Sequence, residues 1–380
     1  MKKLFTSESV GRGHPDKLCD QLSDAILDEY LRLDPYAKVA VEVLASGHNV
    51  IIAGEVNSIV EVNVVEIAIN ILKELGYYTP KTSFLVDIKK QSPDIAQGVE
   101  QGEEIGAGDQ GIMFGYATDE TPEYMPLAIT LAHSLVKQAE HLRQNNEFKY
   151  AKSDMKSQVT LDYTDSNNVK VDTILISIQH SEKYDETLFK SYIKDKIITP
   201  VLAKYHLDLP SNILINPTGK FVIGGPIGDT GLTGRKIIVD TYGGAARHGG
   251  GAFSGKDATK VDRSAAYAAR WIAKNIVAAK LAKRLEVQIA YSIGVAQPVS
   301  IMVETFDTET IDKNIIEQII NEVFDLTPKG IIESLDLRKP IYEKTAYYGH
   351  FGRDDLNLPW ESLSKVSEIK ALAQKYTKNF

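Results

Sequence analysis

The order of apolar and polar positions repeats three times along the chain. In the first repeat, apolar residues recur at helical spacing over residues 17–33. Apolar and polar residues then alternate over 38–45 and 50–56, and a second helical spacing extends to Gly76. Ser58 and Glu61 match a capping box, which predicts that the second helix begins at Ser58. The first unit is therefore predicted to be helix, hairpin, helix.

The same order follows in two later parts of the chain. The second unit has helical patterns at 126–143 and 187–205 around strands within 157–179, and Pro200 should interrupt its last helix. The third unit has a helix, two strands and a helix at residues 261–284, 286–295, 299–305 and 311–325. Three like units predict an α+β protein in which helices cover sheets.

Composition narrows the class of protein. The 380 residues include 43 Lys and Arg against 51 Asp and Glu, a net charge of −8, and 43% of them are hydrophobic. This balance is typical of a soluble globular protein without an overall attraction for nucleic acid or anionic membranes. The single Cys19 fits a reducing compartment, and we find neither a signal peptide nor an apolar stretch of membrane-spanning length. We therefore expect a cytoplasmic protein that binds neither nucleic acid nor membrane.

Glycine-containing segments precede the first helix of each unit, at residues 13–17, 106–111 and 249–257. Glycine allows a backbone to approach a ligand closely, and the free N–H groups at helix N-termini attract anions. Phosphate binding is the first hypothesis that these segments raise.

Two of these segments match nucleotide-binding patterns. Residues 106–111 satisfy the dinucleotide fingerprint, but an acidic loop precedes them and residues 112–116 look extended, so we reject that site. Residues 250–256 satisfy the P-loop pattern, with a strand expected at 237–239 before them. Asp257 stands where a P-loop needs Ser or Thr to bind magnesium. An atypical phosphate-binding loop and a plain glycine-rich connection both stay open.

Basic residues gather around the last of these segments although the chain is acidic: Arg235, Lys236, Arg247, Lys256, Lys260 and Arg263. They alternate with glycine turns and with Asp229, Asp240 and Asp262. Such a mixture suits a polyphosphate held by cations and by metal-binding carboxylates. A solvated charged surface is the alternative.

Other candidate residues lie in the first unit. His14 and Asp16 could bind a ligand or merely cap the first helix. Glu42 and Glu55 are predicted on one face of the first hairpin, where they are either exposed or, if turned inward, bind a cation or an amino group. Cys19 is expected in the core. The acidic residues at every fourth position of the first helix are expected to form a solvated stripe: Asp20, Asp24 and Asp28.

Five motifs together resemble the S-adenosylmethionine synthetase family, also called the methionine adenosyltransferases. They are GHPDK at 13–17, QSPDIAQG at 91–98, GAGDQG at 106–111, NPTGKFVIGGPIGDTGLTGRK at 216–236 and GGGAFSGKD at 249–257. The resemblance extends from about residue 5 to residue 353. It implies three similar helix–hairpin–helix subdomains about a pseudo-threefold axis. We assign them to residues 1–100, 101–222 and 223–380, with chain segments that interleave.

The resemblance implies a transferase that makes S-adenosylmethionine from ATP and L-methionine and hydrolyses the tripolyphosphate to phosphate and pyrophosphate. Two Mg²⁺ ions per site and K⁺ are the implied cofactors. The implied assembly is a homodimer with shared active sites, paired further into a tetramer. Because a thioether sulfur is neutral and needs no general base, catalysis would depend on positioning and on stabilising the leaving triphosphate.

The resemblance also assigns roles to single residues. The implied catalytic set is His14, Lys156, Arg235, Lys236, Lys256 and Asp109. The implied ATP contacts are His14, Asp154, Lys156, Lys220, Phe221, Asp229, Arg235, Lys236, Ala252 and Lys256, with Phe221 stacked on adenine. The implied methionine contacts are Glu55, Gln91, Asp229 and Lys260. Asp16 and Asp262 would bind Mg²⁺, Glu42 would bind K⁺, and residues 91–108 would form a mobile gate.

The sequence departs from the family pattern at several of these places. Gly11 and Arg12 replace a small polar residue and a glutamate, Met155 replaces alanine or serine, and Lys220 replaces arginine. Lysine keeps the charge but lacks the guanidinium fork. These changes bear on the ATP contacts near residues 154–156 and 220.

A P-loop ATPase or kinase and a nucleotide sensor without catalytic activity are the two rival functions.

Overall fold

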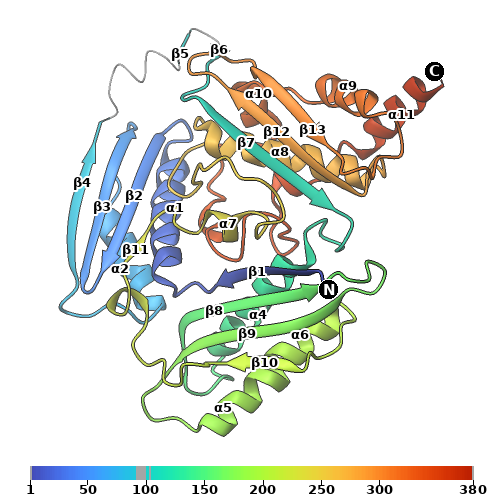
Figure 1. Ribbon diagram of the computed structural model, residues 1–380. Helices are drawn as coiled ribbons and strands as arrows, with labels where there is room; N and C mark the ends of the chain where they lie inside the picture. Colours follow the sequence, from blue (N-terminus) through green and yellow to red (C-terminus); the bar gives the residue numbers. More distant parts are fainter. Residues whose placement is uncertain (1, 91–99, 102–103, 379–380) are drawn as a thin grey trace.

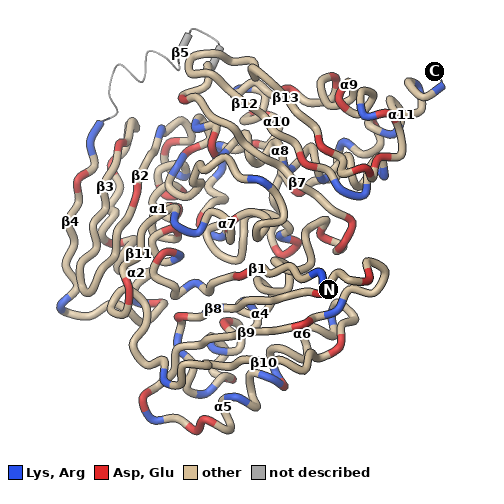
Figure 2. Tube along the Cα trace, viewed as in Figure 1, with Lys and Arg blue, Asp and Glu red and all other residues tan. Residues whose placement is uncertain are grey.

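The computed structural model describes residues 2–90, 100–101 and 104–378. Its strands form three larger sheets and one short pair, and Figure 1 shows the three sheets arranged around the short helix α7 (Ile237–Asp240) and its neighbouring loops. Acidic and basic positions are interspersed over all three groups of strands (Figure 2). No helix of the described residues is long and apolar enough to cross a membrane.

The first sheet has the strand order β11-β2-β3-β4 and is covered by two helices. Its elements are β2 (Lys38–Ser46), β3 (Asn49–Asn57), β4 (Ser83–Lys89), β11 (Gly231–Leu232), α1 (Pro15–Leu33) and α2 (Val64–Glu74). Val39, Val41 and Val43 alternate into the core beside α1, as the sequence predicts. The predicted start of the second helix at Ser58 is wrong. Ser58 donates to Asp34 instead, and Asn63 caps α2 by accepting the Glu66 N–H.

The second sheet has the order β1-β8-β9-β10 and is covered by α4 and a long helical segment. Its elements are β1 (Leu4–Val10), β8 (Ala151–Asp162), β9 (Lys170–His180), β10 (Asn212–Ile215), α4 (Leu127–Gln144), α5 (Glu186–Tyr192) and α6 (Thr199–Lys204). Pro200 lies in the first turn of α6, where a missing N–H costs little. The helix is interrupted before it, by a π-helical turn at Ile193–Ile198.

The third sheet has the order β13-β12-β7, with α8 packed along β7 and β12. Its elements are β7 (Gly111–Thr118), β12 (Arg284–Tyr291), β13 (Ser300–Glu304), α8 (Val261–Ala278), α9 (Lys313–Val323), α10 (Pro328–Ser334) and α11 (Val366–Thr377). The short pair is β5 (Glu100–Gln101) with β6 (Glu104–Ile105). The extended reading of residues 112–116 is confirmed. The strand expected at 237–239 is wrong, because α7 (Ile237–Asp240) forms there.

Helix, two antiparallel strands and helix occur in sequence as α1-β2-β3-α2, α4-β8-β9-α5 and α8-β12-β13-α9. Strands β1, β7 and β11 each complete a sheet built mainly from a different part of the chain. The pseudo-threefold axis and the subdomain boundaries stay predictions.

The acidic stripe of α1 is buried, which contradicts its expected solvation. Asp20 and Asp24 are fully buried, as is Cys19, whose place in the core is confirmed. Asp24 pairs with Arg263 at 2.6 Å, and Asp28 accepts the N–H groups of Tyr342 and Glu343. The helix is covered by its sheet on one side and by distant segments of the chain on the other, so its polar stripe binds those segments.

Buried His133 on α4 gives the fold a defined pH dependence. Burial lowers its pKa to about 3, and the positive charges of Arg353 and Lys17 act in the same direction. The pKa of an unfolded histidine is near 6.5, so the unfolded chain gains a proton that the folded chain does not as the pH falls below that value. This stability contribution is complete above pH 6.5 and is lost as the pH falls toward 3.

We therefore expect wild type to lose up to about 2 kcal/mol more unfolding free energy than His133→Gln between pH 6.5 and pH 5, at about 1.4 kcal/mol per pH unit. Urea unfolding at the two pH values measures this difference. His141→Gln is the matched control, because His141 lies exposed on the same helix. Equal pH dependence in wild type and His133→Gln would contradict the prediction.

Candidate functional site

The free edge of β2 brings two of the glycine-rich segments together. At one end of this edge, β11 pairs with Leu44 and Ala45, and at the other end Lys256 pairs with Ala40. Between them the segments touch, because a Cβ at Gly234 would lie 2.6 Å from the Cβ of Ala252. The segment that carries Arg235 and Lys236 therefore lies against the segment that carries Lys256.

The N-terminus of α1 lies beside the segment that carries Arg235 and Lys236. His14 caps the helix, and its Nδ1 accepts the Asp16 N–H at 3.1 Å. Lys236 Nζ lies 2.5 Å from Asp16 Oδ2, and Arg235 Nε lies 3.9 Å from Asp16 Oδ1. Burial works against ionisation of Asp16, but the hydrogen bonds from Lys236 and from the Leu232 N–H outweigh it and lower its pKa. Burial, reinforced by Lys236, lowers the pKa of His14 to about 3 and keeps the imidazole neutral.

A second lysine–carboxylate pair joins the segment that carries Lys256 to the first turn of α8. Lys256 Nζ donates to Asp262 Oδ2 at 2.7 Å. Gly251 makes room for this carboxylate, since a Cβ there would lie 2.4 Å from Asp262 Oδ1. The two pairs, Lys236 with Asp16 and Lys256 with Asp262, place two cations and two carboxylates beside a glycine-lined backbone.

Asp257 explains why the P-loop pattern fails here. Its Oδ2 accepts the Val39 N–H at 2.7 Å and binds Lys260 Nζ at 2.5 Å, so it anchors the segment to β2. A helix, α7, also replaces the strand that a P-loop requires before it. We therefore reject the P-loop reading, although the segment still presents Lys256 beside glycines.

Two further candidates, Phe221 and Asp154, lie where β9 ends and β8 begins. The backbone of Phe221 makes two hydrogen bonds with His180. The Phe221 N–H donates to the His180 Nε2 at 3.0 Å, and the backbone N–H of His180 donates to the Phe221 carbonyl. Asp154 Oδ2 accepts the Gly225 N–H at 2.8 Å. Burial raises the pKa of Asp154 to about 6, against the opposing effects of Gly225 and Lys156.

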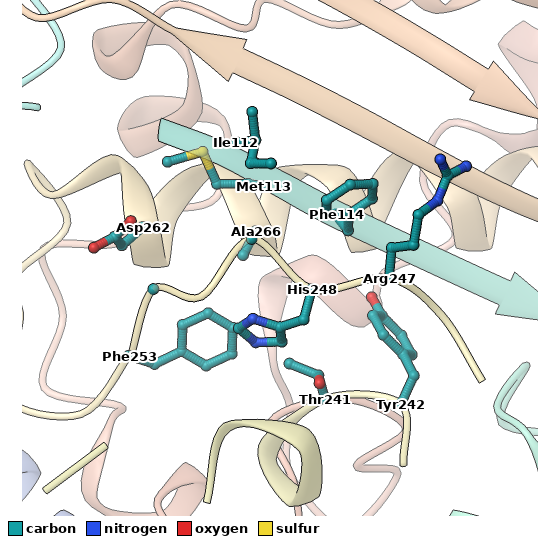
Figure 3. A pocket seen from close by; sticks show the side chains of 12 residues that line it. Ile112, Met113, Phe114, Thr241, Tyr242, Arg247, His248, Phe253, Asp262 and Ala266 are labelled. Carbon is teal, nitrogen blue, oxygen red and sulfur yellow. The ribbon is translucent and has the colours of Figure 1, made fainter. Parts of the chain in front are cut away.

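Two residues of the expected basic cluster do not belong to this group. Arg263 is buried in its ion pair with Asp24. Figure 3 shows Arg247 and Asp262 at opposite ends of a small pocket, and Arg247 is bound to Glu286 at 2.7 Å. The basic cluster therefore has two arginines fewer than the sequence indicates.

The remaining candidate side chains lie on sheet faces or loops that the helices leave open. Glu42 and Glu55 are exposed on one face of the β2–β3 hairpin, as predicted. Lys156 is exposed on β8 next to Val10, on the face away from α4. Exposed loop positions hold Asp109, Lys220 and Asp229. Gln91 and most of the expected gate at 91–108 lie outside the described residues.

Three residues hold this site from behind in roles that sequence reasoning missed: Asp20 is expected in solvent, Asp240 is expected among the metal-binding carboxylates, and His180 is not singled out. Asp20 accepts the Gly234 N–H, Asp240 binds Lys17, and His180 holds Phe221. The four-residue spacing of the acidic residues in α1 is a signal for the first of these. The same spacing is typical of a solvated helix face, and the partners that bury Asp20 and Asp24 lie more than 200 residues away.

The donor set suits the implied magnesium. Asp16 and Asp262 offer carboxylate oxygens, the ligands that Mg²⁺ prefers, and the missing Cβ of Gly251 leaves a cradle at Asp262. Both carboxylates bind lysines, which a bound polyphosphate would attract in their place.

Comparison with known proteins shows the family of the chain. Family models of S-adenosylmethionine synthetase match residues 2–97 for the N-terminal domain, 104–221 for the central domain and 223–362 for the C-terminal domain. The chain is 66% identical to the S-adenosylmethionine synthase of Mycoplasmopsis synoviae and 57% identical to that of Mycoplasma mycoides, covering 97% of both chains in each case. It is 53% identical to that of Clostridium tetani, covering 98% of this chain and all of the other.

These matches extend over nearly the whole chain, and the chain is an enzyme of the transferase class, a methionine adenosyltransferase. It belongs to the S-adenosylmethionine synthetase family. The resemblance drawn from the five motifs is thereby confirmed.

Proposed function

We propose that this enzyme forms S-adenosylmethionine by in-line attack of the methionine sulfur on the ribose C5′ of ATP, and then hydrolyses the tripolyphosphate. One observation carries the proposal. Lys236 and Lys256 lie on two glycine-rich segments that touch at the edge of β2, and each pairs with a carboxylate in the first turn of a helix, Asp16 of α1 and Asp262 of α8. A leaving group with three phosphates needs such an array of fixed cations.

The cations act on the leaving group. Lys236 and Lys256 leave their carboxylates to bind the phosphates, and Arg235 adds a fork that can bind two oxygens at once. His14 stays neutral, and because its Nδ1 accepts the Asp16 N–H, its Nε2 carries the proton and donates a hydrogen bond without adding charge. Lys156, on β8, completes the set of cations that bind the phosphates. Once ATP has bound and these groups contact its phosphates, they stabilise the developing negative charge without further reorganisation.

Adenine and methionine are positioned by the remaining residues. Phe221 stacks on adenine, with Asp154 and Lys220 beside it, and Ala252 contacts ATP from the glycine-rich segment. Glu55, Gln91, Asp229 and Lys260 hold methionine, whose ammonium and carboxylate groups suit this mixed charge. Asp109 contacts the substrates from the segment before β7. The Gln91 assignment rests on the family resemblance, because that residue lies outside the described part of the chain.

Asp16 and Asp262 would hold the two Mg²⁺ ions, and Glu42 would supply a carboxylate oxygen to K⁺. When bound, these ions neutralise phosphate charge and fix the orientation of the triphosphate. The open sheet faces that carry Glu42, Glu55 and Lys156 support a homodimer in which each site is completed by the partner subunit, with two dimers forming a tetramer.

Replacing Phe221 with leucine tests the adenine contact. Leucine keeps an apolar side chain but loses the flat ring, so we expect the KM for ATP to rise about threefold to tenfold, from the loss of about 0.5–1.5 kcal/mol of stacking. Steady-state kinetics measures this, and the KM for methionine is the internal control. An unchanged KM for ATP would place adenine elsewhere.

The release of inorganic products tests the reaction as a whole. With ATP, methionine, Mg²⁺ and K⁺, we expect phosphate and pyrophosphate in equal amounts, and neither without methionine. ADP formation in either case would contradict the proposal and favour a phosphotransferase or ATPase.

A further inference from the structure

A fully buried ion cluster lies directly behind the segment that carries Arg235 and Lys236. Lys17 donates to Asp20 Oδ2 at 2.8 Å and forms a shorter contact with Asp240 Oδ1. The side chains of Lys17 and Asp20 have no exposed surface, and that of Asp240 is 3% exposed. Two carboxylates share one ammonium group. Burial raises the pKa of Asp240 to about 7, and the charge of Lys17 opposes this rise.

The cluster fixes both ends of one short stretch of backbone. Asp20 Oδ1 accepts the Gly234 N–H at 2.8 Å, immediately before Arg235 and Lys236. Asp240, at the end of α7, is bound by Lys17, and its own N–H donates to the Lys236 carbonyl at 2.9 Å. Arg235 and Lys236 are the two residues that directly follow the Gly234 anchor.

The energetics favour a positioning role over a purely stabilising one. Buried ion clusters cost desolvation, and apolar side chains of similar volume are often equally or more stable. What such a cluster does supply is a fixed geometry, because the Gly234 N–H and the Lys17 ammonium each have a directed partner in Asp20. Lys236 Nζ is held on Asp16, which lies one turn before Asp20 on the same face of α1.

From this arrangement we propose that Asp20 is a positioning residue for the reaction: through Gly234 and through the Lys17–Asp240 pair it holds Arg235 and Lys236 where the polyphosphate binds. Asp20 itself is too deeply buried to touch substrate. The inference rests on the proposed function, since it assumes that these two cations bind the triphosphate.

Two substitutions at Asp20 and two at Asp28 test it. Asp20→Leu removes the acceptor for Gly234 and leaves Lys17 paired with Asp240, whereas Asp20→Asn keeps an oxygen for the same N–H. Asp28→Leu and Asp28→Asn are matched controls on the same helix, because Asp28 also accepts backbone N–H groups, but those of Tyr342 and Glu343. Urea unfolding establishes how far each variant loses stability.

We expect Asp20→Leu to lower kcat and the affinity for inorganic tripolyphosphate, measured calorimetrically, by at least tenfold, with the KM for methionine changed less than twofold. Asp20→Asn should recover kcat to within about threefold of wild type, and both Asp28 variants should stay within twofold at similar losses of stability. Equal kcat in Asp20→Leu and Asp28→Leu would overturn the inference. If wild type makes no S-adenosylmethionine, the proposed function fails instead, and the tripolyphosphate affinities still decide the role of Asp20.

Discussion

Replacing Lys256 with alanine is expected to lower turnover at least about tenfold. Lys256 lies on the free edge of β2, held there by its pairing with Ala40, and its ammonium group is 2.7 Å from Asp262. On the proposed mechanism it binds the departing triphosphate, and losing one contact of about 1.4 kcal/mol in the transition state lowers the rate tenfold. The loss should fall on kcat, because the charge that Lys256 stabilises develops as the C5′–oxygen bond breaks.

Steady-state kinetics with saturating ATP and methionine measures this change. Lys190→Ala is the matched control, because Lys190 also pairs with a carboxylate, that of Glu186, but on the exposed surface of α5. Near-normal turnover of Lys256→Ala would remove this lysine from the mechanism.

Replacing Asp24 with alanine is expected to destabilise the protein by about 3–5 kcal/mol. The carboxylate accepts two hydrogen bonds from Arg263, at 2.6 and 2.8 Å, and a third from the Gly255 N–H. Removing it leaves a guanidinium group buried without its counter-charge, which costs several kcal/mol. The pair joins α1 to α8, so its loss should lower the unfolding free energy of the whole fold.

Urea or thermal unfolding measures this loss. Glu29→Ala is the control on the same helix, because Glu29 pairs with Arg32 in a partly exposed position, and surface pairs contribute at most about 1 kcal/mol. A loss of less than about 1 kcal/mol in Asp24→Ala would show that Arg263 finds other partners.

The order of elements could be predicted because each unit carries a clear helical or alternating period. The errors lie where a local signal is overridden by a distant partner. Ser58 matches a capping box but donates to Asp34, and residues 237–239 are apolar and β-branched but form a helical turn beside α1. Neither partner can be read from the neighbouring sequence.

The site was predictable to a lesser extent, for a similar reason. Glycine and lysine in short motifs indicate phosphate binding, and Asp16, Lys236, Lys256 and Asp262 do form two charge pairs. The buried roles of Asp20 and Arg263 depend on which face of a helix meets another segment. An acidic stripe in sequence is equally compatible with solvent and with a buried network, and only the packing around α1 distinguishes them.

Mass spectrometry of the organic product is the most direct test of the central claim. The enzyme is incubated with ATP, methionine, Mg²⁺ and K⁺, and in parallel without methionine. The account predicts S-adenosylmethionine in the complete mixture and no adenosyl product in the other. ADP in both mixtures, with no adenosyl–methionine adduct in either, would contradict it.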